Sequence, residues 1–243
     1  MMTRGMAAVT AALVLACGDG AGPDGDRTVS LSITGGGTPS LAIAAGDTVV
    51  LGGNTLVLDR VQVVLREIEL DRVNDDACDS ILGEDDRCQK FETGPILLDL
   101  PLDGSITTVL SMVVDTGTYG ELEFEIHKPD DDTAADLAFL ADHPEFTRVS
   151  IRAQGTFNGT PFVYETDLNV DQEVDLVPPL VITEFNAPTN LTLRVDVRTW
   201  FVVNGALINP ASANKGGINE GAVKDNVKDS FEAYEDDDHD GDD

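Results

Sequence analysis

The sequence has few of the residues on which most enzyme active sites depend. It contains three histidines, three cysteines and one tryptophan in 243 residues. His127, His143 and His239 stand far apart along the chain, and no G-x-S-x-G, H-E-x-x-H or phosphate-loop motif occurs. These absences favour a non-enzymatic protein. A carboxylate-only mechanism, such as glycoside hydrolysis, stays open as an alternative because 45 acidic residues conceal any catalytic pair.

Basic side chains are also scarce. Fifteen lysines and arginines stand against 45 aspartates and glutamates, which gives a formal net charge of −30 at pH 7. A surface of this charge repels phosphate backbones and anionic lipid headgroups, so we expect no nucleic-acid binding. Cations are the natural partners of such a chain.

The apolar run at residues 6–16 is too short to span a bilayer, but it has the length of a signal-peptide core. A weakly basic stretch precedes it, and the sequence VLAC at residues 14–17 follows. This arrangement resembles the lipobox of bacterial lipoproteins, which implies that residues 1–16 are removed and that Cys17 carries a lipid anchor. Gly18 after the cysteine implies the outer membrane by the sorting rule of such lipoproteins. The alternative is an ordinary secretory signal with an incidental cysteine.

The two other cysteines, Cys78 and Cys88, lie in an acidic loop between residues 71 and 90. In an exported protein, an even pair on one short loop indicates a disulfide. A metal-binding or catalytic pair is the rival interpretation, although the spacing is not C-x-x-C and no histidine is near.

Alternation of apolar and polar residues predicts a mainly β fold. In residues 117–128, GTYGELEFEIHK, the apolar side chains recur at every second position, as they do on one face of a strand. Similar patterns predict an antiparallel β-sandwich over residues 28–209, behind a flexible tether at 17–27. A long strand at 55–70 needs a bulge near residues 66–67 to keep its apolar residues on one face. Asn158-Gly159 predicts a hairpin turn.

Two helices complete the predicted fold. Thr133 and Asp136 match a capping box, which predicts one short crossover helix at residues 133–141. After a linker, Asn219 is expected to cap a C-terminal helix that runs to about residue 234, within the segment 210–235.

The order LLDLPLDGS, an apolar strand and then GTYGELEFEI resembles a family of uncharacterised bacterial lipoproteins, over about residues 55–205. The resemblance implies a sandwich like that of transthyretin. Its motifs are structural, so it implies no catalytic residue.

Two sets of residues are candidate metal ligands. Asp236, Asp238 and Asp240, in the acidic tail at 236–243, reproduce the D-x-D-x-D-G opening of an EF-hand calcium loop. The bidentate glutamate at the twelfth position is missing, so we expect weak calcium binding, with a Kd of about 10⁻⁴ to 10⁻³ M. The alternative is a solvated acidic tail. The second set lies on one face of a strand and has side chains that can bind a metal. Its members are Glu123, Glu125 and His127. The alternative is a sheet face that is simply exposed to solvent.

Trp200 falls on the polar parity of the predicted strand at residues 191–203. An exposed tryptophan is a platform for stacking a sugar, and the alternative is a rim residue covered by a loop. We therefore expect a lipid-anchored, exported β-sandwich of the bacterial cell envelope that acts as a non-enzymatic surface or ligand-binding module. Its expected partners are the membrane, divalent cations and a surface glycan or protein. The alternatives are a calcium-stabilised structural or adhesion domain and a carboxylate-based glycan hydrolase.

Overall fold

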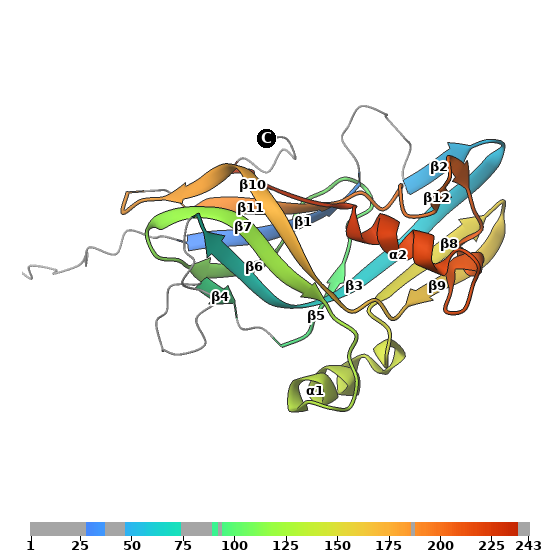
Figure 1. The fold of residues 1–243 in the computed structure, drawn as a ribbon, viewed down its shortest axis with the longest axis horizontal. Coiled ribbons are helices and arrows are strands. Elements are labelled where there is room, and N and C mark those ends of the chain that lie inside the picture. The colour runs from blue at the N-terminus through green and yellow to red at the C-terminus, as the bar shows by residue number, and fades with distance from the viewer. Residues whose placement is uncertain (1–27, 37–46, 74–88, 92–93, 186–187, 238–243) are drawn as a thin grey trace, which may run out of the picture.

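The computed structural model describes residues 28–36, 47–73, 89–91, 94–185 and 188–237, and strands dominate this part of the chain (Figure 1). The mainly β prediction is confirmed. The strands are β1 (Thr28–Gly35), β2 (Asp47–Leu51), β3 (Asn54–Arg72), β4 (Gln89–Phe91), β5 (Ile96–Asp99), β6 (Thr107–Val113), β7 (Gly117–Ile126), β8 (Ile151–Phe157), β9 (Thr160–Thr166), β10 (Val170–Ile182), β11 (Thr189–Val195), β12 (Val202–Val203), β13 (Ala206–Leu207) and β14 (Phe231–Glu235). The helices are α1 (Ala134–Asp142) and α2 (Glu220–Lys228), and the 3-10 turns are η1 (Pro144–Phe146) and η2 (Pro210–Ala213).

Two sheets form the body of the protein. One has the strand order β14-β11-β1-β6, and the other has the order β10-β7-β3-β8-β9, with β2, β4 and β5 also paired to β3. In Figure 1 the long β3 runs diagonally through the molecule and links both halves of the larger sheet. The described pairs are antiparallel except for β1 and β11, which run parallel.

The core lies between these sheets. Leu31 and Ile33 of β1 belong to the same buried cluster as Leu122 and Phe124 of β7. The ring of Phe124 also contacts that of Phe231 on β14, with centroids 5.2 Å apart. Side chains alternate across a strand, so each apolar residue that faces this core leaves its neighbours on the outer face.

The predicted bulge lies in β3. The register with β7 shifts between Arg66 and Glu69, and Glu67 takes a positive φ of 51°. The extra residues restore the parity, so Leu65 before the bulge and Ile68 after it are both buried in the core. As a consequence Arg66 and Glu69 share the outer face.

The crossover helix α1 follows the predicted sequence signal. Thr133 Oγ1 accepts a hydrogen bond from the backbone N–H of Asp136 at 3.0 Å, as an N-cap does. Phe139 of the helix packs with Phe146 and with Val64 of β3, in a second buried cluster apart from the main core. Helix α1 therefore lies against Val64 of β3, on the outer face of the larger sheet.

The C-terminal helix is shorter than predicted. It ends at Lys228, and residues 231–235 form β14, which pairs with β11. The prediction of a helix to residue 234 was wrong because Phe231 and Tyr234 were taken as one stripe with Val223 and Val227. Only the last two of these lie on the buried side of α2, whereas Phe231 and Ala233 alternate as strand residues do. Neither described helix is long and apolar enough to cross a membrane.

Candidate functional site

The outer face of the larger sheet carries the polar residues of β7. Leu122, Phe124 and Ile126 point into the core, which turns the glutamates between them to the other side. Because β7 lies between β3 and β10, each of these glutamates meets a neighbour on both sides.

Strand register places acidic residues in two adjacent rows. Glu123 lies opposite Glu173 of β10 and Glu69 of β3. In the next row, Glu121 lies opposite Asp175 and Asp71. Like charges directly opposite each other destabilise a sheet. We refer to five of these residues as the acidic face: Asp71, Glu121, Glu123, Glu173 and Asp175.

The crowding of negative charge raises pKa values on this face. Burial, and then repulsion from Asp71, raises the pKa of Glu123 to about 7 from its ordinary value of 4.5. Burial, followed by Glu173, Asp175 and Asp71, also raises the pKa of Glu121. Glu123 therefore holds a proton more readily than an ordinary glutamate does, and a cation placed beside it would favour the charged form.

The acidic face lacks compensating groups within the described residues. Oδ1 of Asp71 is buried and receives no hydrogen bond from a nitrogen or hydroxyl donor there. Likewise, no lysine or arginine of the described ranges forms an ion pair with Glu121, Glu123, Glu173 or Asp175.

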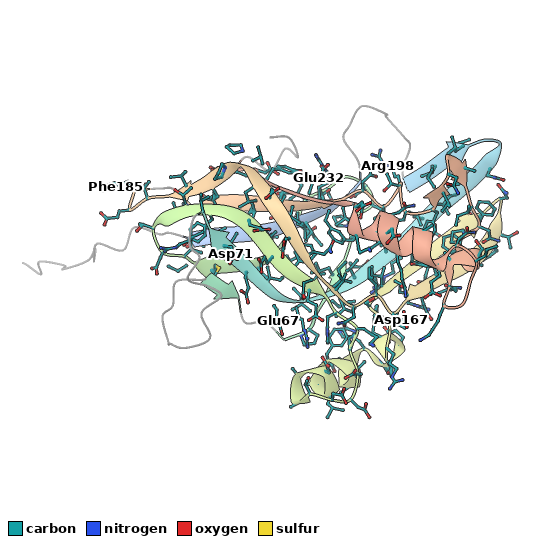
Figure 2. All side chains as sticks on the ribbon, in the orientation of Figure 1. Glu67, Asp71, Asp167, Phe185, Arg198 and Glu232 are labelled. Carbon is teal, nitrogen blue, oxygen red and sulfur yellow. The ribbon has the colours of Figure 1, made fainter. Side chains whose placement is uncertain are left out.

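A carboxylate outside the acidic face, Asp167, has two cationic partners. Asp167 receives the ammonium groups of Lys215 and Lys224, each at 2.7 Å, and hydrogen bonds from these lysines lower its pKa to about 2. Figure 2 shows Asp167 and Asp71 toward opposite ends of the molecule. Among the described residues, Asp167 is thus paired with two lysines, whereas Glu121, Glu123, Glu173 and Asp175 are paired with none.

The metal site predicted at Glu123, Glu125 and His127 does not form as expected. Glu125 is buried and pairs with Arg66, and its Oε1 accepts a hydrogen bond from Asn169 Nδ2 at 2.7 Å. His127 is buried too, with its Nε2 2.8 Å from Asp136 Oδ1 at the start of α1. Only Glu123 belongs to the acidic face. Within the described residues, no group of three or more His, Cys, Asp or Glu side chains could hold a metal ion.

Trp200 is not a stacking platform. Its side chain is fully buried, and its Nε1 donates a hydrogen bond to Ser230 Oγ at 2.8 Å. Strand β11 ends at Val195, so the parity that predicted exposure does not reach residue 200. Trp200 is therefore neither an exposed stacking platform nor a residue at the rim of the sheet. It belongs to the main core.

The remaining predicted sites fall wholly or partly outside the described residues. Cys17, Cys78, Cys88, Asp238 and Asp240 lie in the segments that the structure does not describe. Asp236 is described, and it is buried rather than solvated, with Oδ2 accepting a hydrogen bond from Thr192 Oγ1 at 3.1 Å.

Sequence reasoning found the glutamates of β7 but missed their neighbours. The period-two carboxylates of Asp171, Glu173 and Asp175 are visible in the sequence, and so are those of Glu69 and Asp71. Their meeting depends on strand order and register, which no local pattern specifies.

Comparisons with known proteins add a distant likeness. No family model matches the chain, and no curated protein matches it. The chain is similar to a solved structure, MbnP from Methylosinus trichosporium, at 10% sequence identity and a TM-score of 0.39. The match covers 85% of this chain and 97% of the other.

Proposed function

We propose that the protein is a lipid-anchored, exported β-sandwich that acts as a non-enzymatic binding module, and that its acidic face binds a basic polypeptide segment of a partner. The observation that carries the proposal is the register of β3, β7 and β10. It aligns the five carboxylates of the acidic face, together with Glu69, in two rows, and no lysine or arginine of the described residues forms an ion pair with Glu121, Glu123, Glu173 or Asp175.

The geometry of the face suits an extended basic segment. Carboxylates two residues apart on one strand are separated by about 6.6 Å, and those on neighbouring strands by about 4.8 Å. Alternate side chains of an extended peptide have the same spacing of about 6.6 Å, so successive lysines or arginines on one side of a peptide can each meet a carboxylate.

Charge supports the proposal in a second way. The net charge of −30 steers cationic partners toward the protein, and the acidic face gives them a place to dock. Binding would relieve the repulsion between facing carboxylates, so the protein would lose an unfavourable interaction as it gains favourable ones.

A titration with pentalysine, followed by calorimetry at low salt, tests the proposal. Wild type is expected to bind, and the variant Glu121→Gln/Glu123→Gln is expected to bind at least about tenfold more weakly, since two close charge pairs are lost. The matched control is Asp225→Asn/Asp229→Asn, in α2 and at its C-cap, which removes the same charge elsewhere. Equal weakening in both variants would mean that net charge alone binds the peptide, and the acidic face would not be a site.

Calcium is a second candidate ligand, favoured by the D-x-D-x-D-G motif that begins at Asp236. Because Asp236 is buried against Thr192, any ion there would rely on Asp238 and Asp240. A melting temperature that rises in millimolar calcium and falls back with chelator would support this site. An unchanged melting temperature would exclude a stabilising role for calcium.

A further inference from the structure

An open groove lies beside α1 on the outer face of the larger sheet, next to residues 60–62 of β3. Its volume is about 690 Å³, which is in the range of small-ligand sites. One wall is α1, with Ala138 and Phe139, and the other includes Pro95 and Leu97. These side chains give the groove an apolar lining.

The groove is separate from the acidic face. On β3, Arg60 and Gln62 precede Val64, whose side chain is covered by Phe139 of α1, whereas Asp71 lies beyond the bulge. Helix α1 therefore stands between the two regions, and an inference about the groove does not depend on the acidic face.

An amide that faces the groove can bind a ligand. Gln62 is only 3% exposed and lines the groove, and no hydrogen bond is found between its side chain and another described residue. Its amide atoms are not among the fully buried polar atoms that lack a partner, so water reaches them in the groove. A glutamine amide presents an acceptor together with two donors. A ligand that brings both a donor and an acceptor would satisfy it.

Paired charges lie at the rim. Arg60 Nε donates to Asp99 Oδ2 at 2.9 Å, and Nη2 donates to the same oxygen. Both side chains remain about half exposed, at 50% and 51%. Arginine carries five N–H donors, so N–H groups of Arg60 remain to meet a carbonyl while Asp99 accepts from an N–H.

The backbone beside the groove is also open. The N–H of Leu100 donates to Val61 of β3 at 2.9 Å, so by alternation the backbone groups of Leu97 and Asp99 are turned away from β3. No other strand pairs with β5 within the described residues. Such an edge can accept an extended peptide.

We propose that this groove binds a short extended peptide segment with an apolar side chain on the lining of Leu97, Ala138 and Phe139, and with its amide groups on Gln62 and the Arg60–Asp99 pair. The groove offers hydrogen-bond donors and acceptors next to an apolar surface and the open edge of β5. A peptide backbone can use all three features, whereas a simple hydrocarbon can use only the apolar surface. Asp99 and Asp142 at the rim disfavour an acidic residue in the bound segment.

The test is an NMR titration of the full chain with blocked tripeptides of the form acetyl-Gly-X-Gly-amide, in which X is Leu or Asp. The Leu peptide is expected to shift the signals of the Gln62 side-chain amide and of the backbone amides of Leu97 and Asp99. It is expected to bind at least about tenfold more tightly than the Asp peptide, because the lining is apolar and the rim is acidic.

Two variants locate the binding. Gln62→Leu should weaken the Leu peptide about tenfold, whereas Gln154→Leu, the same change on the neighbouring β8, should not. Ala138→Trp, at an exposed position of α1, should fill the groove and abolish binding without unfolding the protein. The proposal is overturned if the Leu peptide gives no shifts at millimolar concentration, if it shifts only residues outside the groove, or if Ala138→Trp binds it as wild type does.

Discussion

Glu123 of β7 lies directly opposite Glu173 of β10, so two carboxylates face each other across a hydrogen-bonded strand pair. Two residues further along β7, Glu125 faces Arg66 of β3 and forms an ion pair with it. Within the described residues, Glu125 therefore has a cationic partner, whereas neither Glu123 nor Glu173 forms an ion pair with a lysine or arginine. Facing carboxylates weaken a sheet, and a role in binding gives a physical reason for the arrangement.

The first prediction concerns stability and pH. Because the pKa of Glu123 is raised to about 7, the folded state holds a proton that the unfolded chain releases near 4.5. The contribution of Glu123 to stability is therefore greatest at low pH, and it falls as the pH rises from about 4.5 to about 7. Glu123→Gln should raise the free energy of unfolding by about 1 kcal/mol at about pH 8, after allowance for solvent screening, and by much less at about pH 5.

Urea unfolding at the two pH values measures this difference. Asp225→Asn, on the exposed side of α2, is the control and should change little at either pH. A Glu123→Gln variant that is less stable than wild type at the higher pH would show that the charge of Glu123 does not destabilise the fold.

The second prediction compares two arginines. Glu125 is buried, so replacing Arg66 by Met leaves a buried carboxylate without its charged partner, and should destabilise the fold by about 3 kcal/mol. Arg60→Met breaks a pair in which both side chains are about half exposed, and should cost less than about 1 kcal/mol. Chemical denaturation of both variants gives the comparison, and equal losses would refute the distinction.

The third prediction concerns Trp200, the single tryptophan of the chain. Because its ring is fully buried, its fluorescence should be blue-shifted and poorly quenched by acrylamide, and free sugars should not alter it. Trp200→Phe removes the hydrogen bond to Ser230 and should destabilise the fold by about 1 to 3 kcal/mol. Strong quenching of the native protein would contradict the burial of this residue.

The fourth prediction concerns the anchor. If Cys17 carries a lipid, the Cys17→Ala variant expressed in a bacterial host should move from the membrane fraction to the soluble fraction. The matched control is Cys78→Ala/Cys88→Ala, which leaves the lipobox intact and should stay with the membrane if it folds. A Cys17→Ala variant that is retained on membranes as wild type is would refute the anchor.

Local patterns in the sequence predicted much of the fold. The bulge at Arg66 and Glu67, the turn at Asn158-Gly159 and the cap at Thr133 each depend on a few neighbouring residues, and each lies where it was expected. Trp200 was misplaced because its strand ended five residues earlier, and Phe231 because helical and strand spacing coincide over short apolar runs.

The candidate sites depend on long-range pairing, which local patterns do not contain. Glu123 and Glu173 are 50 positions apart, and only the strand order brings them together. Gln62 reads as an ordinary outward residue of β3 until α1 is placed over the neighbouring Val64. In both cases the polar side chain was visible in the sequence, but the residues that pack beside it in the fold were not.

The pH dependence of pentalysine binding tests the central claim most directly. Protonation of Glu123 competes with the bound cation, so the affinity of wild type should rise about three- to tenfold between about pH 6 and about pH 8, at constant ionic strength. The Glu123→Gln variant should show less than about a twofold rise over the same range. An affinity that is independent of pH in wild type, or that rises equally in Glu123→Gln, would contradict binding at the acidic face.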